Sequence, residues 1–181
     1  MELEGNLFFG IEDQPAPLGD ESKDLSPILF KLSMKRKIYS KDLGINLKTC
    51  KEEEFFKWFL ACLLFGKPIQ QKVAKRTYFE FKQAGILTPE KILKAGWDKL
   101  VEILDQGGYV RYDFSTATKL LEICKELKEK YDSLTKLFKV SKNITDLAKR
   151  LQEFKGIGPV TTRIFLRDLK PIYNKIKSRS L

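Results

Sequence analysis

The stretch with the clearest chemistry lies near the end of the chain and reads Phe154-Lys155-Gly156-Ile157-Gly158-Pro159-Val160-Thr161-Thr162. Its glycines can adopt positive φ and let the backbone approach another surface closely. Pro159 suits the first position of a helix, where a missing N–H costs nothing. The next amides, of Val160 and Thr161, would then be free at the positive end of a helix dipole. Such a helix end can bind a phosphate, and this is the chemistry that the stretch predicts.

Positive charge surrounds this stretch and also dominates the chain. Lys155, Arg163, Arg167 and Lys170 flank the predicted phosphate site. The chain has 34 Lys and Arg against 24 Asp and Glu, a net charge of +10 and a pI near 9.4. This excess indicates a polyanionic partner, most simply nucleic acid. A lysine-rich protein without such a partner would have the same charge, so the charge alone does not decide.

Other kinds of chemistry are excluded by composition. The chain has no His, which removes imidazole bases, His-based triads and His metal ligands. Cys50, Cys62 and Cys124 are far apart and form no CxxC pair. We therefore expect neither a disulfide framework nor a thiolate metal site, and no cofactor.

Two helical patterns must position the predicted phosphate site. The first has apolar residues with one-face helical spacing, namely Ile144, Leu147, Ala148, Leu151 and Phe154, and Ser141 or Thr145 opens it. The second has the same kind of spacing in Val160, Ile164, Phe165 and Leu169. The sequence thus predicts two helices joined by a short turn with glycines.

The rest of the chain also reads as helices. Residues Lys51 to Phe65 are apolar nearly all round, which predicts a buried central helix that ends at Gly66-Lys67-Pro68. Thr88 precedes Pro89 as a helix cap, and Gly96 ends the short helix that follows. No stretch alternates with period two long enough for a strand, so we expect an all-α fold.

The domain organisation is predicted to be simple. Residues 1–25 are acidic and rich in turn residues, and we interpret them as a lead or strap. Residues 26–181 form one helical domain, whose first helix begins at Ser26 and is basic. No segment reads as a signal peptide or a membrane span, since the longest apolar run, Phe55 to Phe65, is too short. We expect a cytoplasmic monomer without a membrane partner.

The stretch from Phe154 to Thr162 resembles the helix-hairpin-helix motif of DNA-binding and base-excision-repair proteins, (Leu/Phe)-x-Gly-(Ile/Val)-Gly-x-x-Thr-(Ala/Thr). The order of elements from Glu52 to Asp168 is similar to that of the endonuclease III-type superfamily of DNA glycosylases. This resemblance implies a two-lobed bundle of short helices with a cleft between the lobes. The hairpin would grip duplex DNA near the nucleoid, and a base would be flipped into the cleft. The alternative is a helical hairpin whose glycines only permit a tight turn.

The resemblance also assigns roles to individual residues. The residues implied to bind DNA lie in the hairpin and in the turn after the central helix: Lys155, Gly156, Ile157, Gly158, Val160, Thr161, Arg163, Gln70 and Gln71. A glutamine would fill the hole left by the flipped base or contact its partner. Ordinary surface polarity is the alternative for both glutamines.

The chain departs from the family pattern at the catalytic positions. The catalytic Lys of the bifunctional members is replaced by Val160, so no Schiff base can form there. The expected Asp is replaced by Ser178, Arg179 or Ser180. The remaining catalytic candidates are Asp168 and Asp113, with a surface ion pair and helix capping as their alternative roles. The family's four-Cys motif is also absent, so we expect no iron–sulfur cluster.

Three functions remain open from the sequence. The first is a monofunctional DNA glycosylase that removes an altered or mispaired base. The second is a non-catalytic protein of the same fold that binds duplex DNA or lesions. The third is an RNA-binding or protein-interaction domain in which the hairpin is incidental.

Overall fold

The computed structural model describes residues 37–179, and these are helical without any strand. The elements are η2 (Ser40–Leu43), η3 (Leu47–Thr49), α2 (Glu52–Phe65), α3 (Gln71–Gln83), α4 (Pro89–Gln106), α5 (Asp113–Lys130), α6 (Leu134–Val140), α7 (Ile144–Glu153), α8 (Pro159–Leu169), η4 (Lys170–Ile172) and α9 (Tyr173–Ser178). The predicted all-α class is confirmed. The predicted lead at 1–25 and the basic helix that begins at Ser26 lie outside the described residues.

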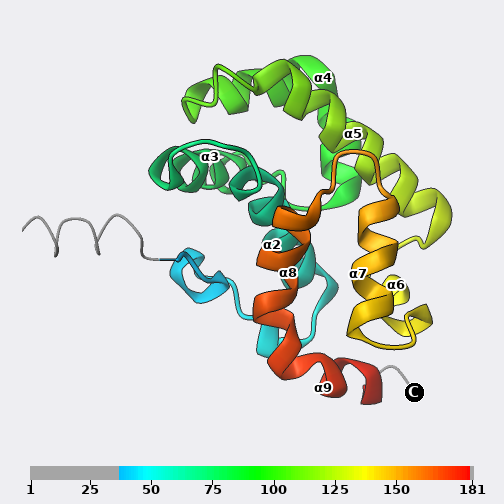
Figure 1. The fold of residues 1–181 in the computed structure, drawn as a ribbon. Helices are drawn as coiled ribbons and strands as arrows, with labels where there is room; N and C mark the ends of the chain where they lie inside the picture. Colours follow the sequence, from blue (N-terminus) through cyan, green and yellow to red (C-terminus); the bar gives the residue numbers. More distant parts are fainter. Residues whose placement is uncertain (1–36, 180–181) are drawn as a thin grey trace, which may run out of the picture. The chain divides into compact units, whose positions relative to one another are not determined.

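Helix α2 is the centre of the core, as its apolar sequence predicts. Phe55, Trp58 and Leu64 are fully buried, and α3, α6 and α8 all pack against this helix (Figure 1). The indole of Trp58 donates a hydrogen bond to the backbone oxygen of Phe165 at 3.2 Å, which joins α2 to α8. The helix ends at Gly66, as predicted.

Helices α4 and α5 pack along each other and are joined by a short connection. The Thr88 hydroxyl caps α4 by accepting from the Lys91 N–H at 3.3 Å, and Gly96 interrupts the helix with φ 74°. In the connection, the buried Tyr109 donates from its hydroxyl to the carbonyl of Leu64. This bond fixes the α4–α5 pair to the end of α2, close to the turn that leads into α3.

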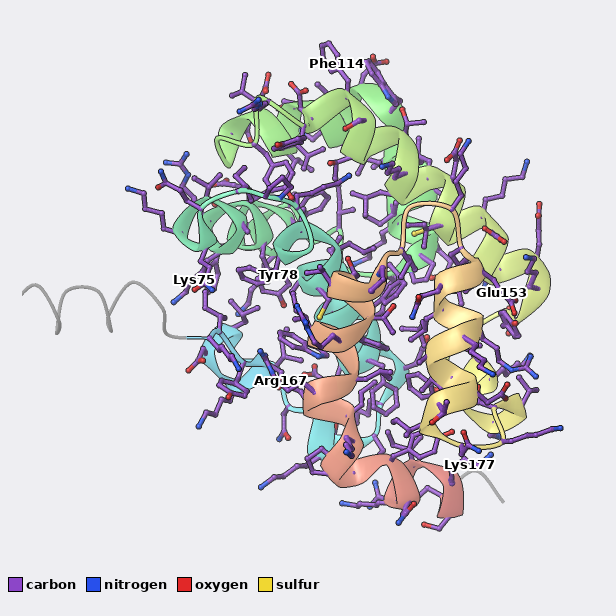
Figure 2. The ribbon with its side chains drawn as sticks, viewed as in Figure 1. Lys75, Tyr78, Phe114, Glu153, Arg167 and Lys177 are labelled. Carbon is purple, nitrogen blue, oxygen red and sulfur yellow. The ribbon has the colours of Figure 1, made fainter. Side chains whose placement is uncertain are left out.

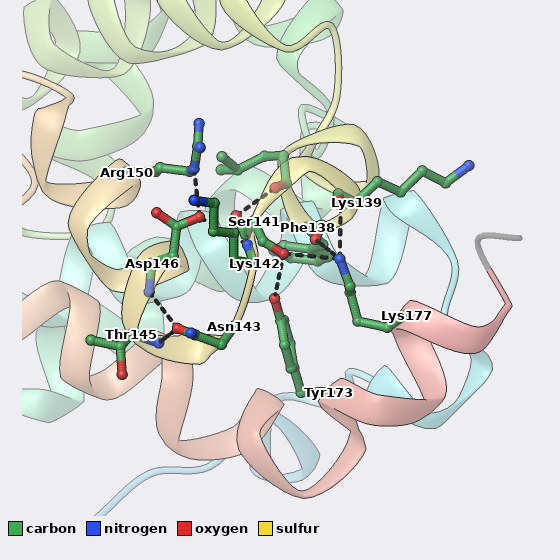
Figure 3. A network of polar contacts seen from close by, with 11 residues as sticks. Phe138, Lys139, Ser141, Lys142, Asn143, Thr145, Asp146, Arg150, Tyr173 and Lys177 are labelled. Carbon is green, nitrogen blue, oxygen red and sulfur yellow. Dashed lines mark hydrogen bonds and ion pairs between the residues drawn. The ribbon is translucent and has the colours of Figure 1, made fainter.

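The base of α7 is held by a network of polar contacts (Figure 3). Asn143, rather than Ser141 or Thr145, caps α7, because its side-chain oxygen accepts from the Thr145 and Asp146 amides. Lys177 of α9 donates to the carbonyl oxygens of Lys139 and Ser141 at 2.7 and 2.9 Å. Lys177 therefore joins α9 to the C-terminal end of α6.

None of the helices within residues 37–179 has the length and apolar character needed to cross a membrane.

Candidate nucleic-acid interface

A turn of five residues, Phe154 to Gly158, joins α7 to α8, and the two helices pack against each other. Gly156 has φ 105°, in the region that favours glycine. Gly158 has φ −97° and ψ 178°, which is extended backbone open to any residue. The prediction that both glycines can use positive φ is therefore correct for Gly156 and wrong for Gly158.

The turn is anchored to the core by its apolar side chains. Phe154 and Ile157 are buried, and the Ile157 N–H donates to the Phe154 carbonyl at 3.0 Å. Thr161 is also buried, and a Cβ on Gly66 would overlap with its hydroxyl. The side chains of Ile157 and Thr161 thus face inward, so either residue could contact DNA only through its backbone.

Helix α8 begins with free backbone donors, as predicted. Pro159 is its first residue, and Gly158 supplies no side-chain cap. The first backbone bond at this end is donated by Thr162 to the Gly158 carbonyl at 3.1 Å. The amides of Val160 and Thr161 consequently have no acceptor among residues 37–179. A phosphate oxygen in front of them would complete the helix end.

Two lysines from other elements meet beside this turn. The stem of Lys119, from α5, crosses Gly156, where an added Cβ would lie 3.0 Å from its Cδ. Lys67 directly follows Gly66 at the end of α2, and its amine lies close enough to that of Lys119 for the two charges to interact. Burial, followed by the neighbouring Lys119 charge, lowers the pKa of Lys67 from 10.5 to about 8.

The turn carries further exposed groups. Lys155 and Arg163 are exposed on either side of the start of α8, and Val160 is 46% exposed. Within residues 37–179, none of the four cations Lys67, Lys119, Lys155 and Arg163 forms an ion pair. We call these four residues the hairpin cation cluster.

The predicted glutamines lie on the turn that leads away from this cluster. Gln70 precedes α3 and Gln71 begins it, and both are exposed. Only three residues separate Gln70 from Gly66, which packs on Thr161. The structure therefore brings both glutamines to the same region as the hairpin, without fixing their side chains on a described partner.

Arg167, labelled in Figure 2, and its neighbour Asp168 belong to the last turn of α8, at the end away from the hairpin turn. The Asp168 carboxylate accepts from the Ser40 N–H at 2.7 Å and from Arg167 Nε at 2.8 Å. The Arg167 guanidinium stacks 4.1 Å from the Tyr39 ring centroid. The expectation that Arg167 surrounds the phosphate site is wrong, since it instead fastens η2 to α8. These residues also line a pocket of about 770 Å³ with η3 and η4.

Asp113 forms a carboxyl pair with Asp105 at the junction of α4 and α5. Asp113 is buried and is the first residue of α5, and its carboxylate accepts from the Phe114 N–H at 2.6 Å. Its hydrogen bond and negative charge raise the pKa of Asp105. Asp105 therefore keeps its proton to a higher pH than an isolated aspartate would. The N-cap of α5 is Tyr112, so Asp113 is not the cap that the sequence predicts.

The positions at which the resemblance implies an aspartate also lie far from the turn. Ser178 ends α9 and Arg179 follows it, and α9 lies at the opposite end of α8 from the turn (Figure 1). Position 180 is outside the described residues. No acid from this segment therefore lies near Val160.

Sequence reasoning missed Lys67 and Lys119 as members of the site. In the sequence, Lys67 contributes only to Gly66-Lys67-Pro68, which indicates the end of a helix. Lys119 lies far from the hairpin in the sequence. Comparisons with protein-family models, curated proteins and solved structures find no match to this chain.

Proposed function

We propose that this protein binds the backbone of duplex DNA through the α7–α8 hairpin, as a base-excision-repair protein that resembles a DNA glycosylase. The observation that carries the proposal is the hairpin cation cluster beside two free amides. Like charges without acidic partners repel one another, and an anion placed among them removes the repulsion. The helix end adds donors that match phosphate oxygens. Sequence-independent binding follows, because these groups face the backbone rather than the bases.

We also propose the architecture, the glutamine contacts and the location that the resemblance implies. In it, the helices form two lobes with a cleft, and the turn with Gln70 and Gln71 borders the bound duplex. The protein acts as a monomer on chromosomal DNA in the cytoplasm, at the nucleoid. Lyase chemistry through the hairpin is not part of the proposal, because Val160 has no amine.

A salt titration tests the hairpin. Each phosphate contact contributes about 0.9 to the slope of log K against log salt concentration. Lys155→Glu and Arg163→Glu should each lower the affinity for all duplex sequences alike and flatten this slope. Lys139→Glu is the matched control, because its side chain extends away from the contacts at the base of α7 (Figure 3). It changes the net charge equally but should leave the slope unchanged.

Two results of this titration would contradict the proposal. An unchanged slope in both hairpin variants would remove the hairpin from the interface. Tighter binding of single-stranded RNA than of duplex DNA would favour the RNA-binding interpretation instead.

A second candidate function, base release, is favoured by the carboxyl pair. Hydrolysis of a glycosidic bond uses carboxyl groups as acid, base or stabiliser of a sugar cation. Asp105, with its raised pKa, and Asp113 bring two carboxyl groups together where α4 meets α5. Asp168 is the weaker candidate, because its carboxylate is already bound by Ser40 and Arg167.

A further inference from the structure

The contact between Lys67 and Lys119 is built into the fold. The Lys119 stem is held against Gly156 of the turn. Lys67 is placed by Gly66, which lies so close to Thr161 that no side chain fits between them. Three separate elements, the end of α2, α5 and the hairpin, thus place Lys67 and Lys119 beside the same turn, where their charges interact. The pair therefore depends on the packing of several elements and not on the conformation of one exposed lysine side chain.

Two amines in contact need either a lost proton or an anion. A protonated lysine has three donors and no acceptor, so two ammonium groups cannot hydrogen-bond to each other. Without a ligand, the pair is relieved when Lys67 loses its proton, which agrees with its lowered pKa. An anion with several acceptor oxygens would let both amines stay charged and donate to it.

We propose that Lys67 and Lys119 bind the terminal phosphate of a DNA strand, so that the protein prefers duplexes with a phosphorylated nick or end. This inference rests on the proposed function, and it names which DNA the hairpin would select. An internal phosphodiester has one negative charge, whereas a terminal phosphate monoester has nearly two at neutral pH and three terminal oxygens. The second charge interacts with both amines at close range. Lys155 and Arg163 remain available for the neighbouring internal phosphates.

The experiment measures affinity by fluorescence anisotropy at one fixed salt concentration. The probes are an intact duplex and nicked duplexes with 5′-phosphate, 3′-phosphate or hydroxyl groups only at the nick. We expect the wild-type protein to bind one phosphorylated nick about fivefold or more tighter than the hydroxyl nick. The double variant Lys67→Met/Lys119→Met should bind phosphorylated and hydroxyl nicks with equal affinity, and its affinity for every duplex should fall because the hairpin cation cluster has lost two charges.

Lys125→Met is the control, because Lys125 is exposed on the same helix as Lys119. It should keep the full preference. Deoxynucleoside 5′-monophosphate is added as a competitor to separate a strand end from a free phosphate monoester. Strong competition at concentrations comparable with those of the DNA would overturn the assignment to a strand end.

The outcomes separate this inference from the proposed function. Equal affinity for phosphorylated and hydroxyl nicks, with intact duplex still bound, would overturn the inference alone. A preference that survives in the double variant would also overturn it. Failure to bind any duplex would overturn the proposed function as well.

Discussion

At the scale of single residues, two glycines of the site differ in the space that is available for a side chain. Gly66 has an ordinary helical conformation, but an added Cβ would overlap with the Thr161 hydroxyl and lie 3.2 Å from the Cys62 carbonyl oxygen. Gly158 has extended backbone, and an added Cβ would meet nothing within 4 Å. Close packing therefore requires the first glycine, and nothing within the described protein requires the second.

This contrast predicts the effects of two alanine substitutions. Gly66→Ala should lower the free energy of unfolding by about 1–3 kcal/mol, because the hairpin must shift to admit the methyl group. Gly158→Ala should change it by less than about 0.5 kcal/mol. Because the added methyl group would meet nothing within 4 Å in the described protein, it should weaken duplex binding only if the DNA itself approaches Gly158. Urea unfolding and anisotropy measure the two effects, and equal stability loss in both variants would contradict the packing argument.

The same residues show how far the sequence could predict the site. Spacing and residue type were sufficient for Pro159 and the free amides, because helix starts depend on local backbone chemistry. They were not sufficient for Gly158, since its φ depends on the path of the whole turn. Lys119 joins the site only through packing of α5 against the turn. A contact between residues so far apart in sequence has no local signal.

At the scale of elements, apolar periodicity predicted the long helices well. The apolar side chains from Phe55 to Phe65 could all be removed from water only at the centre of a core, and α2 lies there. The short elements η2, η3 and η4 were not predicted, because three or four residues show no periodicity. Their positions depend on distant partners, as when Asp168 of α8 binds the Ser40 amide of η2.

One carboxylate at the base of α7 predicts how stability responds to pH. Asp146 accepts from the Lys142 N–H at 2.9 Å and from Arg150 Nε at 3.0 Å, and these bonds lower its pKa below 3.8 (Figure 3). A carboxyl with a lowered folded-state pKa stabilises the fold above its unfolded pKa. That stabilisation is lost as the pH falls through the folded-state value.

Asp146→Asn should therefore destabilise the protein at pH 7, and this effect should shrink as the pH falls below 3.8. Urea unfolding at several pH values measures this difference. Asp98→Asn is the control, because Asp98 is exposed on α4, and its stability curve should follow that of the wild type. A destabilisation of Asp146→Asn that stays constant down to low pH would show that the carboxylate charge is not responsible.

At the scale of the whole molecule, the residues proposed for binding and those proposed for catalysis lie at different positions. The hairpin cation cluster lies at the start of α8, whereas the carboxyl pair lies where α4 meets α5. Asp168 lies at the far end of α8. A glycosylase needs an acid that can reach the sugar of a backbone held by the hairpin. Of the two acids considered from the sequence, Asp113 is the one that lies beside a second carboxyl group, that of Asp105.

Single-turnover assays with excess protein test whether base release occurs. The substrates are labelled duplexes with uracil, thymine opposite guanine, 8-oxoguanine, hypoxanthine or 3-methyladenine, resolved with and without alkali. If the carboxyl pair is catalytic, one substrate should be nicked only after alkali, because Val160 cannot form a Schiff base. Asp113→Asn should then reduce the rate at least about a hundredfold, whereas Asp168→Asn should leave it nearly unchanged in folded protein. Duplex binding without nicking of any substrate would instead make the protein a non-catalytic DNA-binding relative, in which the carboxyl pair only orders the start of α5.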